Sequence, residues 1–152
     1  RLVPDIIKSV FEKNKKIIIR NPDSVRPWQY VLEPLYGYML LAKRLYEGRK
    51  NFSGAWNFGP NLKNCLTVKE LTEKAIKILQ TGSSIIKKDL AKHEAKLLKL
   101  NSNKAKTKLG WQPTFSLDKT LEFTFFWYRH FYDKKDIINL TNQQIKSFFD
   151  NI

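Results

Sequence analysis

Residues 19–35 read IRNPDSVRPWQYVLEPL and combine four structural signals in a row. The stretch starts at the end of a short β-branched run, which is typical of a buried strand, and enters the turn 21–24. Pro27 keeps Arg26 extended, because the residue before a proline is biased away from helix. Glu33-Pro34 then opens a helix, since proline is accepted in a first helical turn. The stretch therefore predicts a strand, a turn, an extended arginine and a helix in succession.

On both sides of this stretch, the apolar residues mostly recur at helical spacing. Helices are predicted at about 3–11, 34–46, 67–80, 102–109 and 117–132, and a last one is predicted to start at Thr141-x-x-Gln144. Thr67-x-x-Glu70 is a capping box at the start of the third. Short strands are predicted at 16–20, 55–58, 84–88 and 96–100. We expect one α/β domain over residues 1–152, whose strands are too few and short for a complete dinucleotide-binding sheet.

Two of the predicted helices carry notable apolar surfaces. The helix at 34–46 places Leu35, Tyr38, Met39, Ala42, Leu45 and Tyr46 on one face. The helix at 117–132 is apolar on two sides, because Phe123, Phe126, Trp127 and Phe131 lie opposite its core-facing residues. We expect this second surface to contact a part of the protein outside the chain.

Composition excludes several classes of protein. The chain has 152 residues, of which 42% are hydrophobic and 13% aromatic, so a single core is expected rather than disorder. Its apolar runs are far shorter than the roughly 18–20 residues that cross a membrane. No secretory signal is recognised, and the single cysteine, Cys65, can form neither an internal disulfide nor a zinc site alone. We expect a cytoplasmic protein with no metal and no membrane partner.

The charge is strongly basic. There are 28 lysines and arginines against 14 acidic residues, which gives a formal net charge of +14. Such a charge is compatible with a lysine-rich solvated face, a phosphate-rich small ligand or a nucleic acid. The lysines are spread along the chain, and no RNA-binding signature or helix-turn-helix pair is recognised. We therefore expect no nucleic-acid partner.

Motifs for cofactor binding and catalysis are missing from the chain. The six glycines form no Gly-rich phosphate loop. His93 and His130 are too far apart in sequence to suggest a metal site. Tyr46 and Lys50 have the spacing of a short-chain dehydrogenase pair, but Gly48 interrupts the helix between them. We expect no catalytic residue in this chain.

Residues 26–35, RPWQYVLEPL, resemble a stretch of CDP-glucose 4,6-dehydratases, which reads RPWQHVLEPL. These enzymes belong to the extended short-chain dehydrogenase/reductase family of nucleotide-sugar enzymes. Further stretches that resemble the family are RLVPDII at 1–7, WNFGPN at 56–61, HEAKLLKL at 93–100 and LGWQP at 109–113. Tyr30 departs from the pattern, because the family usually has histidine there. The resemblance covers essentially the whole chain.

The resemblance implies an activity and a place in a larger protein. The family oxidises C4 of the glucose of CDP-glucose with NAD, eliminates water across C5–C6 and returns the hydride to C6. The product is a precursor of bacterial dideoxy sugars, such as those of lipopolysaccharide O-antigen. The match begins mid-protein, and the chain starts at Arg1 rather than methionine. We expect the C-terminal substrate-binding part of an extended Rossmann-type enzyme, inactive alone, with NAD bound mainly by an N-terminal Rossmann half that is missing here. The full-length protein is expected to form a homo-oligomer.

The resemblance also implies a set of substrate-binding residues. The fork of the Arg26 guanidinium would clamp the diphosphate through parallel hydrogen bonds. The other implied contacts are Arg1 and Leu2 along the sugar–nucleotide channel, Ile18 and Arg20 along the nucleoside, Asn61 at the nucleotide, and His93 with Glu94 over the phosphate or ribose. Two alternatives remain open: another nucleotide-sugar epimerase or dehydratase of the same family, and a basic nucleic-acid-binding module.

Overall fold

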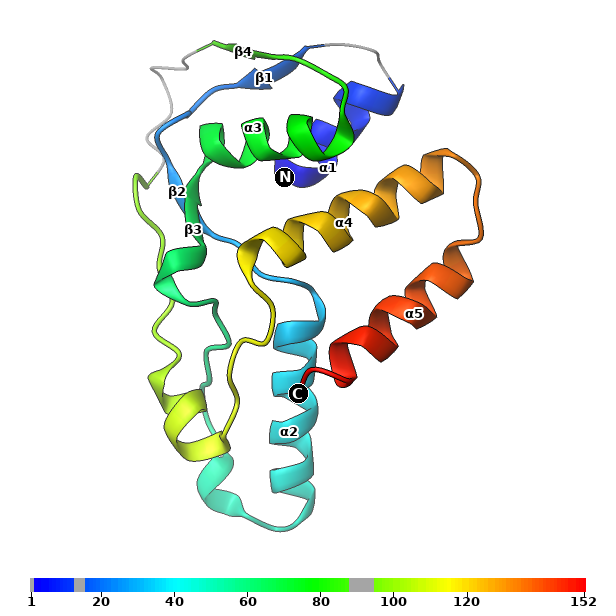
Figure 1. Ribbon diagram of the computed structural model, residues 1–152. Coiled ribbons are helices and arrows are strands. Elements are labelled where there is room, and N and C mark those ends of the chain that lie inside the picture. The colour runs from blue at the N-terminus through cyan, green and yellow to red at the C-terminus, as the bar shows by residue number, and fades with distance from the viewer. Residues whose placement is uncertain (1, 13–15, 88–94) are drawn as a thin grey trace.

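A computed structural model describes residues 2–12, 16–87 and 95–152 of the chain. The described elements are, in order, α1 (Leu2–Ile7), η1 (Lys8–Glu12), β1 (Ile17–Ile19), β2 (Val25–Pro27), α2 (Leu32–Tyr46), η2 (Lys50–Phe52), η3 (Leu62–Asn64), β3 (Cys65–Thr67), α3 (Val68–Leu79), β4 (Ser84–Ile86), η4 (Ala105–Leu109), α4 (Leu117–Tyr132) and α5 (Ile137–Phe149). Figure 1 shows β1 and β4 above α3, while α2 extends away from them at the opposite end of the molecule. The predicted mixture of several helices and a few short strands is confirmed.

The described strands form two small sheets. β1 pairs with β4 in parallel, with Ile18 opposite Ile85. β2 pairs with β3 in antiparallel, with Arg26 opposite Leu66. The predicted strands at 16–20 and 84–88 are confirmed as β1 and β4, and the extended conformation of Arg26 is confirmed in β2. The strand predicted at 96–100 is wrong in extent, because that segment is reduced to one parallel bridge between Leu97 and Val25.

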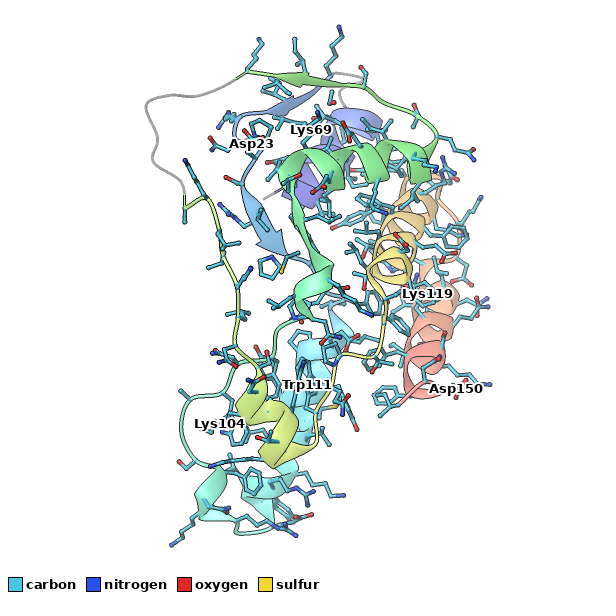
Figure 2. The ribbon with its side chains drawn as sticks, turned by 60° about the vertical axis from the view of Figure 1, so that its left-hand side comes forward. Asp23, Lys69, Lys104, Trp111, Lys119 and Asp150 are labelled. Carbon is cyan, nitrogen blue, oxygen red and sulfur yellow. The ribbon has the colours of Figure 1, made fainter. Side chains whose placement is uncertain are left out.

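The turn at 21–24 is held by the start of α3. The Val68 amide donates to the Ser24 carbonyl (3.0 Å), and the Lys69 amide donates to the Pro22 carbonyl (3.1 Å). Figure 2 shows Asp23 and Lys69 near each other at this junction. β2, which contains Arg26, directly follows this turn. The contacts with α3 therefore fix the position at which β2 begins.

The capping box predicted at the start of α3 is confirmed. The Thr67 hydroxyl accepts from the Glu70 amide (3.1 Å), and the Glu70 carboxylate accepts from the Thr67 amide (2.8 Å). These bonds satisfy donors that have no partner within the helix. They also lower the pKa of Glu70, because both the backbone and the side chain of Thr67 donate to its carboxylate.

The main core lies between α1, α3 and α4, as expected for two amphipathic helices packed on a third. Its buried residues are Ile6, Ile7, Ile17, Leu71, Ala75, Leu79, Leu117, Leu121 and Phe125. A second cluster surrounds Trp111, which is fully buried where the chain after η4 meets α2 (Figure 2). A third cluster joins Tyr30, Phe115 and Phe148, so α5 is attached to the start of α2.

Three sequence predictions differ from the structure. The segment 55–58 belongs to no described sheet, although its pattern predicts a strand. The apolar face predicted for α2 is exposed, because the opposite face, with Gly37, packs on the protein. The last helix begins after Asp136, whose carboxylate accepts from the Asn139 amide (2.9 Å), and not at Thr141. Among the described residues, no helix is long and apolar enough to cross a membrane.

Candidate functional site

Arg26 lies at the middle of β2, between two neighbouring segments. On one side it is opposite Leu66 of β3. On the other side the chain from Lys96 to Leu98 runs along β2, since the Val25 amide donates to the Lys96 carbonyl (2.8 Å) and the Leu98 amide donates to the Val25 carbonyl (3.2 Å). The arginine is therefore carried by backbone that is hydrogen-bonded on both edges.

The guanidinium of Arg26 is oriented by backbone carbonyls. Its Nη1 donates to the carbonyl of Val25 (2.9 Å) and to that of Ala95 (2.8 Å). Ala95 directly follows His93 and Glu94 in the sequence. These two predicted site residues lie outside the described residues, as does Arg1. Arg26 therefore contacts the residue that follows His93 and Glu94 in the sequence. The roles of His93, Glu94 and Arg1 stay predictions.

The predicted nucleoside contacts lie on and just after β1. Ile18 is 52% exposed, whereas Ile17 and Ile19 are each 2% exposed. Ile18 therefore points out of the core while its neighbours hold the strand in place. Arg20 is exposed at the residue after β1. The exposure of both side chains is compatible with contacts to a base and a phosphate. No contact of this kind is tested, and the roles of Ile18 and Arg20 stay predictions.

The two remaining predicted residues lie in different surroundings. Leu2 begins α1 and packs, half-buried, against the main core. Asn61 is half-buried, and its side-chain oxygen accepts from the Lys106 ammonium (2.9 Å). That contact ties the segment after Gly59-Pro60 to η4. Lys106 brings a positive charge beside Asn61, a neighbour that the sequence did not indicate.

Glu33 is a buried carboxylate that the sequence analysis did not single out. It is 2% exposed, and its carboxylate accepts from the amides of Thr114 (3.0 Å) and Phe115 (2.8 Å). Its carbonyl also accepts from the Trp111 indole (2.9 Å). Burial raises the pKa of Glu33, while the two amides act in the opposite direction. The hydrogen bonds of Glu33 join the start of α2 to the segment after η4. The carboxylate within residues 19–35 therefore has a structural role.

Tyr30, which stands where the family usually has histidine, is also structural. It is 6% exposed, and its hydroxyl donates to the side-chain oxygen of Gln144 in α5 (2.8 Å). Burial raises its pKa to about 12, so it stays protonated at neutral pH. The hydroxyl of Tyr30 thus joins α5 to the chain that leads into α2.

A cavity of about 470 Å³ lies beside these residues, between α1, α4, α5 and the segment 28–32. Its lining is mostly apolar and includes Val3, Trp28, Phe123, Trp127 and Ile145. None of the predicted site residues that the structure describes lines it. Within residues 2–12, 16–87 and 95–152, no three His, Cys, Asp or Glu side chains come together as a metal site would require.

The chain is similar in sequence to a known enzyme. No family model matches the chain. The sequence is 40% identical over 149 residues to CDP-glucose 4,6-dehydratase of Salmonella typhimurium, a match that covers 97% of this chain. The predicted resemblance is confirmed. The chain spans about 41% of the length of that dehydratase relative.

Solved structures of nucleotide-sugar enzymes share the fold. A dTDP-glucose 4,6-dehydratase from Bacillus anthracis, solved in complex with NAD, superposes with a TM-score of 0.68 at 23% identity, over 85% of this chain and 39% of that one. A UDP-glucuronic acid 4-epimerase from Bacillus cereus gives a TM-score of 0.70 at 22% identity, over 87% and 40%. The predicted fold class, an α/β part of an extended Rossmann-type fold with several helices and a few short strands, is confirmed by these similarities.

Proposed function

We propose that this chain is the CDP-sugar-binding part of an NAD-dependent CDP-glucose 4,6-dehydratase, of which the remaining part precedes it. The observation that carries the proposal is the 40% identity to the Salmonella dehydratase over 97% of the chain. Arg26 belongs to the matching stretch, and its guanidinium is oriented by two backbone carbonyls. The likeness to solved dehydratases and epimerases supports the fold of such an enzyme.

Arg26 is the residue we assign to the diphosphate. A guanidinium is planar and always charged, and it presents donors in a fork that matches phosphate oxygens. Orientation by Val25 and Ala95 reduces the rotamer freedom that the side chain would lose on binding. Each charge-assisted hydrogen bond contributes roughly 1.5–3 kcal/mol. In this account Arg26 binds and orients the substrate and takes no part in proton or hydride transfer.

The residues of this chain do not fit NAD. Its six glycines are Gly37, Gly48, Gly54, Gly59, Gly82 and Gly110, and no three of them have the G-x-G-x-x-G spacing of a dinucleotide loop. The chain also holds no uninterrupted Tyr-x-x-x-Lys helix. We therefore assign NAD, the oxidation–reduction steps and the elimination of water to the part of the enzyme outside the chain. The 152 residues alone are expected to be catalytically inactive.

The nucleotide base is assigned by the sequence match. The epimerase and dTDP-glucose dehydratase structures are less than 25% identical to this chain, so they support the fold and not the substrate. The Salmonella relative is named for CDP-glucose. We therefore propose that the nucleotide of the substrate is a cytidine nucleotide. We also propose that the full-length enzyme is a homo-oligomer.

Calorimetric titration tests this assignment. CDP-glucose, UDP-glucose and a short DNA duplex are titrated at 50 and 200 mM salt into the chain and into the longer protein. We expect binding of CDP-glucose at least tenfold tighter than UDP-glucose, with a modest salt dependence. Equal affinity for both sugars would redirect the assignment to a related epimerase or dehydratase. Tight DNA binding that falls steeply with salt, as counterion release requires, would contradict it.

A further inference from the structure

The C-terminal end of α2 projects from the molecule. Figure 1 shows this end, and the turn that follows it, at the opposite end of the molecule from β1 and β4. The helix ends at Tyr46, Gly48 turns the chain with a φ of 76°, and η2 begins at Lys50. Tyr46 and Lys50 therefore share no helix, although their spacing resembles a catalytic pair. The side chain of Tyr46 is 94% exposed, the largest exposed fraction of any large apolar or aromatic side chain that the structure describes.

The surroundings of Tyr46 are basic. Residues 43–50, which we call the tip, include four cations, and these are Lys43, Arg44, Arg49 and Lys50. The single carboxylate within the tip is that of Glu47, whose Oε2 accepts from Arg44 (3.4 Å) and lies 3.3 Å from Nε of Arg49. One carboxylate thus serves two arginines, so most of the positive charge of the tip is uncompensated. Lys43, Arg49 and Lys50 are all exposed.

Acidic residues are missing from the segments next to the tip. Residues 48–69 and 95–117 contain no Asp or Glu, although the chain has 14 acidic residues. The cations of these segments are Arg49, Lys50, Lys63, Lys96, Lys99, Lys104, Lys106 and Lys108. η4 belongs to the second segment, and its Ala105 and Leu109 lie in one buried cluster with Phe52 of η2. Figure 2 shows Lys104, just before η4, at this end of the molecule. The lysines are spread along the sequence, but this end is strongly basic because the acidic side chains lie elsewhere.

A flat anionic partner fits the tip better than a small anion or a nucleic acid does. Neither the cavity of about 470 Å³ nor one of about 270 Å³ between α4 and α5 is lined by a residue of the tip, so neither offers an enclosed pocket there. Single-stranded nucleic acids stack their bases on several aromatic side chains along a groove, whereas the tip presents one exposed tyrosine. A bilayer surface is broad enough to meet all the cations of a projecting turn at once, and tyrosine is enriched at membrane–water interfaces.

We propose that the tip binds the surface of a bilayer that contains anionic phospholipids. Lys43, Arg49 and Lys50 contact the lipid headgroups, and the ring of Tyr46 lies at the membrane–water interface. This binding goes beyond the proposed function, because none of the predicted substrate-binding residues lies within the tip. It departs from the sequence expectation of no membrane partner, which rested on the lack of a run long enough to cross a bilayer, because a surface contact needs no such run.

Vesicle sedimentation tests the membrane contact. The longer protein is mixed with vesicles of phosphatidylcholine alone and with vesicles that also contain about 30% phosphatidylserine, at about 50 and 200 mM salt. We expect partitioning onto the anionic vesicles to be about tenfold stronger or more, and to weaken at the higher salt. Equal partitioning onto both kinds of vesicle would overturn the proposal. Binding to a short DNA duplex without binding to the anionic vesicles would also overturn it, in favour of a nucleic acid.

Matched variants separate the tip from the net charge of the protein. The tip variant is Lys43→Gln/Arg49→Gln/Lys50→Gln, and the control is Lys77→Gln/Lys135→Gln/Lys146→Gln, which neutralises three exposed lysines outside the tip. Each cation removed from the tip should weaken partitioning onto anionic vesicles by about fivefold, whereas the control should bind like the wild type. Equal losses in the tip variant and the control would overturn the proposal, because net charge alone would then explain the binding.

The variant Tyr46→Ser tests the role of the ring. It should weaken partitioning by an amount that changes little with salt, because the ring contributes apolar contact and no charge. Unchanged partitioning of Tyr46→Ser would overturn the proposal, since a purely ionic contact does not need the ring. The tip variant and Tyr46→Ser are expected to keep CDP-glucose binding in solution. Vesicle binding by a protein that does not bind CDP-glucose would contradict the substrate assignment alone, so the two failures are distinguishable.

Discussion

The Nη1 atom of Arg26 lies 2.8 Å from the carbonyl oxygen of Ala95, although 69 residues separate them in sequence. This bond joins the middle of β2 to the chain that runs along it from Lys96 to Leu98. The arginine is thus held by the fold before any ligand arrives, and a held guanidinium loses less freedom when it binds a diphosphate.

Replacing Arg26 with lysine separates charge from geometry. Lysine keeps the positive charge but lacks the planar fork, so we expect Arg26→Lys to weaken CDP-glucose binding by about tenfold, which is the loss of roughly one charge-assisted hydrogen bond. Arg26→Ala should lose more. The check is the dissociation constant of each variant from calorimetry. An Arg26→Lys variant that binds like the wild type would show that charge alone suffices.

Glu33 gives the stability of the protein a distinct pH dependence. Burial raises the pKa of this carboxyl in the folded state, so its contribution to stability is fully present below the unfolded pKa and is lost as pH rises through the folded pKa. The wild type should therefore lose stability relative to Glu33→Gln as pH rises from about 4.5, the ordinary value. Urea unfolding of both proteins between pH 4 and 7 measures the difference. A difference that grows in favour of the wild type with rising pH would contradict this.

Gly37 is required for the close packing of α2 on the segment 55–58. A Cβ at this position would lie 2.6 Å from Cε1 of Phe58. Alanine favours helix over glycine by roughly 1 kcal/mol, yet we expect Gly37→Ala to destabilise the protein by about 1–3 kcal/mol because the contact is overpacked. Denaturant unfolding measures the change. The double variant with Phe58→Leu should recover part of the loss, and a stabilised Gly37→Ala would show that the ring moves aside freely.

The capping box of α3 makes a prediction for Thr67. Removing the hydroxyl in Thr67→Ala leaves the Glu70 amide without its acceptor and should cost about 1 kcal/mol of stability. The pKa of Glu70 should rise only part of the way toward its ordinary value, because the backbone amide of residue 67, the larger cause of the lowered pKa, is kept and only the hydroxyl bond is lost. Chemical denaturation and an NMR titration of the Glu70 carboxyl measure the two effects. The control Thr67→Ser keeps a hydroxyl and should preserve both, and an unchanged pKa in Thr67→Ala would contradict the assignment.

Local signals in the sequence predicted much of the fold. The capping box at Thr67, the aromatic helix over Leu117–Tyr132 and the extended Arg26 all depend on residues close in sequence, and all three are confirmed. The predicted start of α5 was wrong because Thr141 competes poorly with Asp136, whose carboxylate reaches the helix amides one turn earlier. The Thr141 hydroxyl instead bonds to the Ile137 carbonyl within the helix (2.7 Å).

Long-range packing explains what the sequence could not predict. The alternation in residues 55–58 correctly indicates extended chain, but a strand also needs a partner, and no described segment provides one. α2 has apolar residues on two of its faces. Only the packing around Trp111 and Phe58 decides which of the two faces is buried. The bond from Arg26 to Ala95 and the anchoring of Glu33 likewise join distant segments, so no local pattern indicates them.

In the proposed function, Arg26 binds the diphosphate of a CDP-sugar. The most direct test of this role is calorimetric titration of CDP-glucose into the longer protein, comparing the wild type with Arg26→Ala and with the control Arg49→Ala. Arg49 is an exposed arginine that pairs with Glu47 beyond the end of α2. We expect Arg26→Ala to weaken binding by at least 30-fold and Arg49→Ala to leave it unchanged. Equal affinity of all three proteins for CDP-glucose would contradict it.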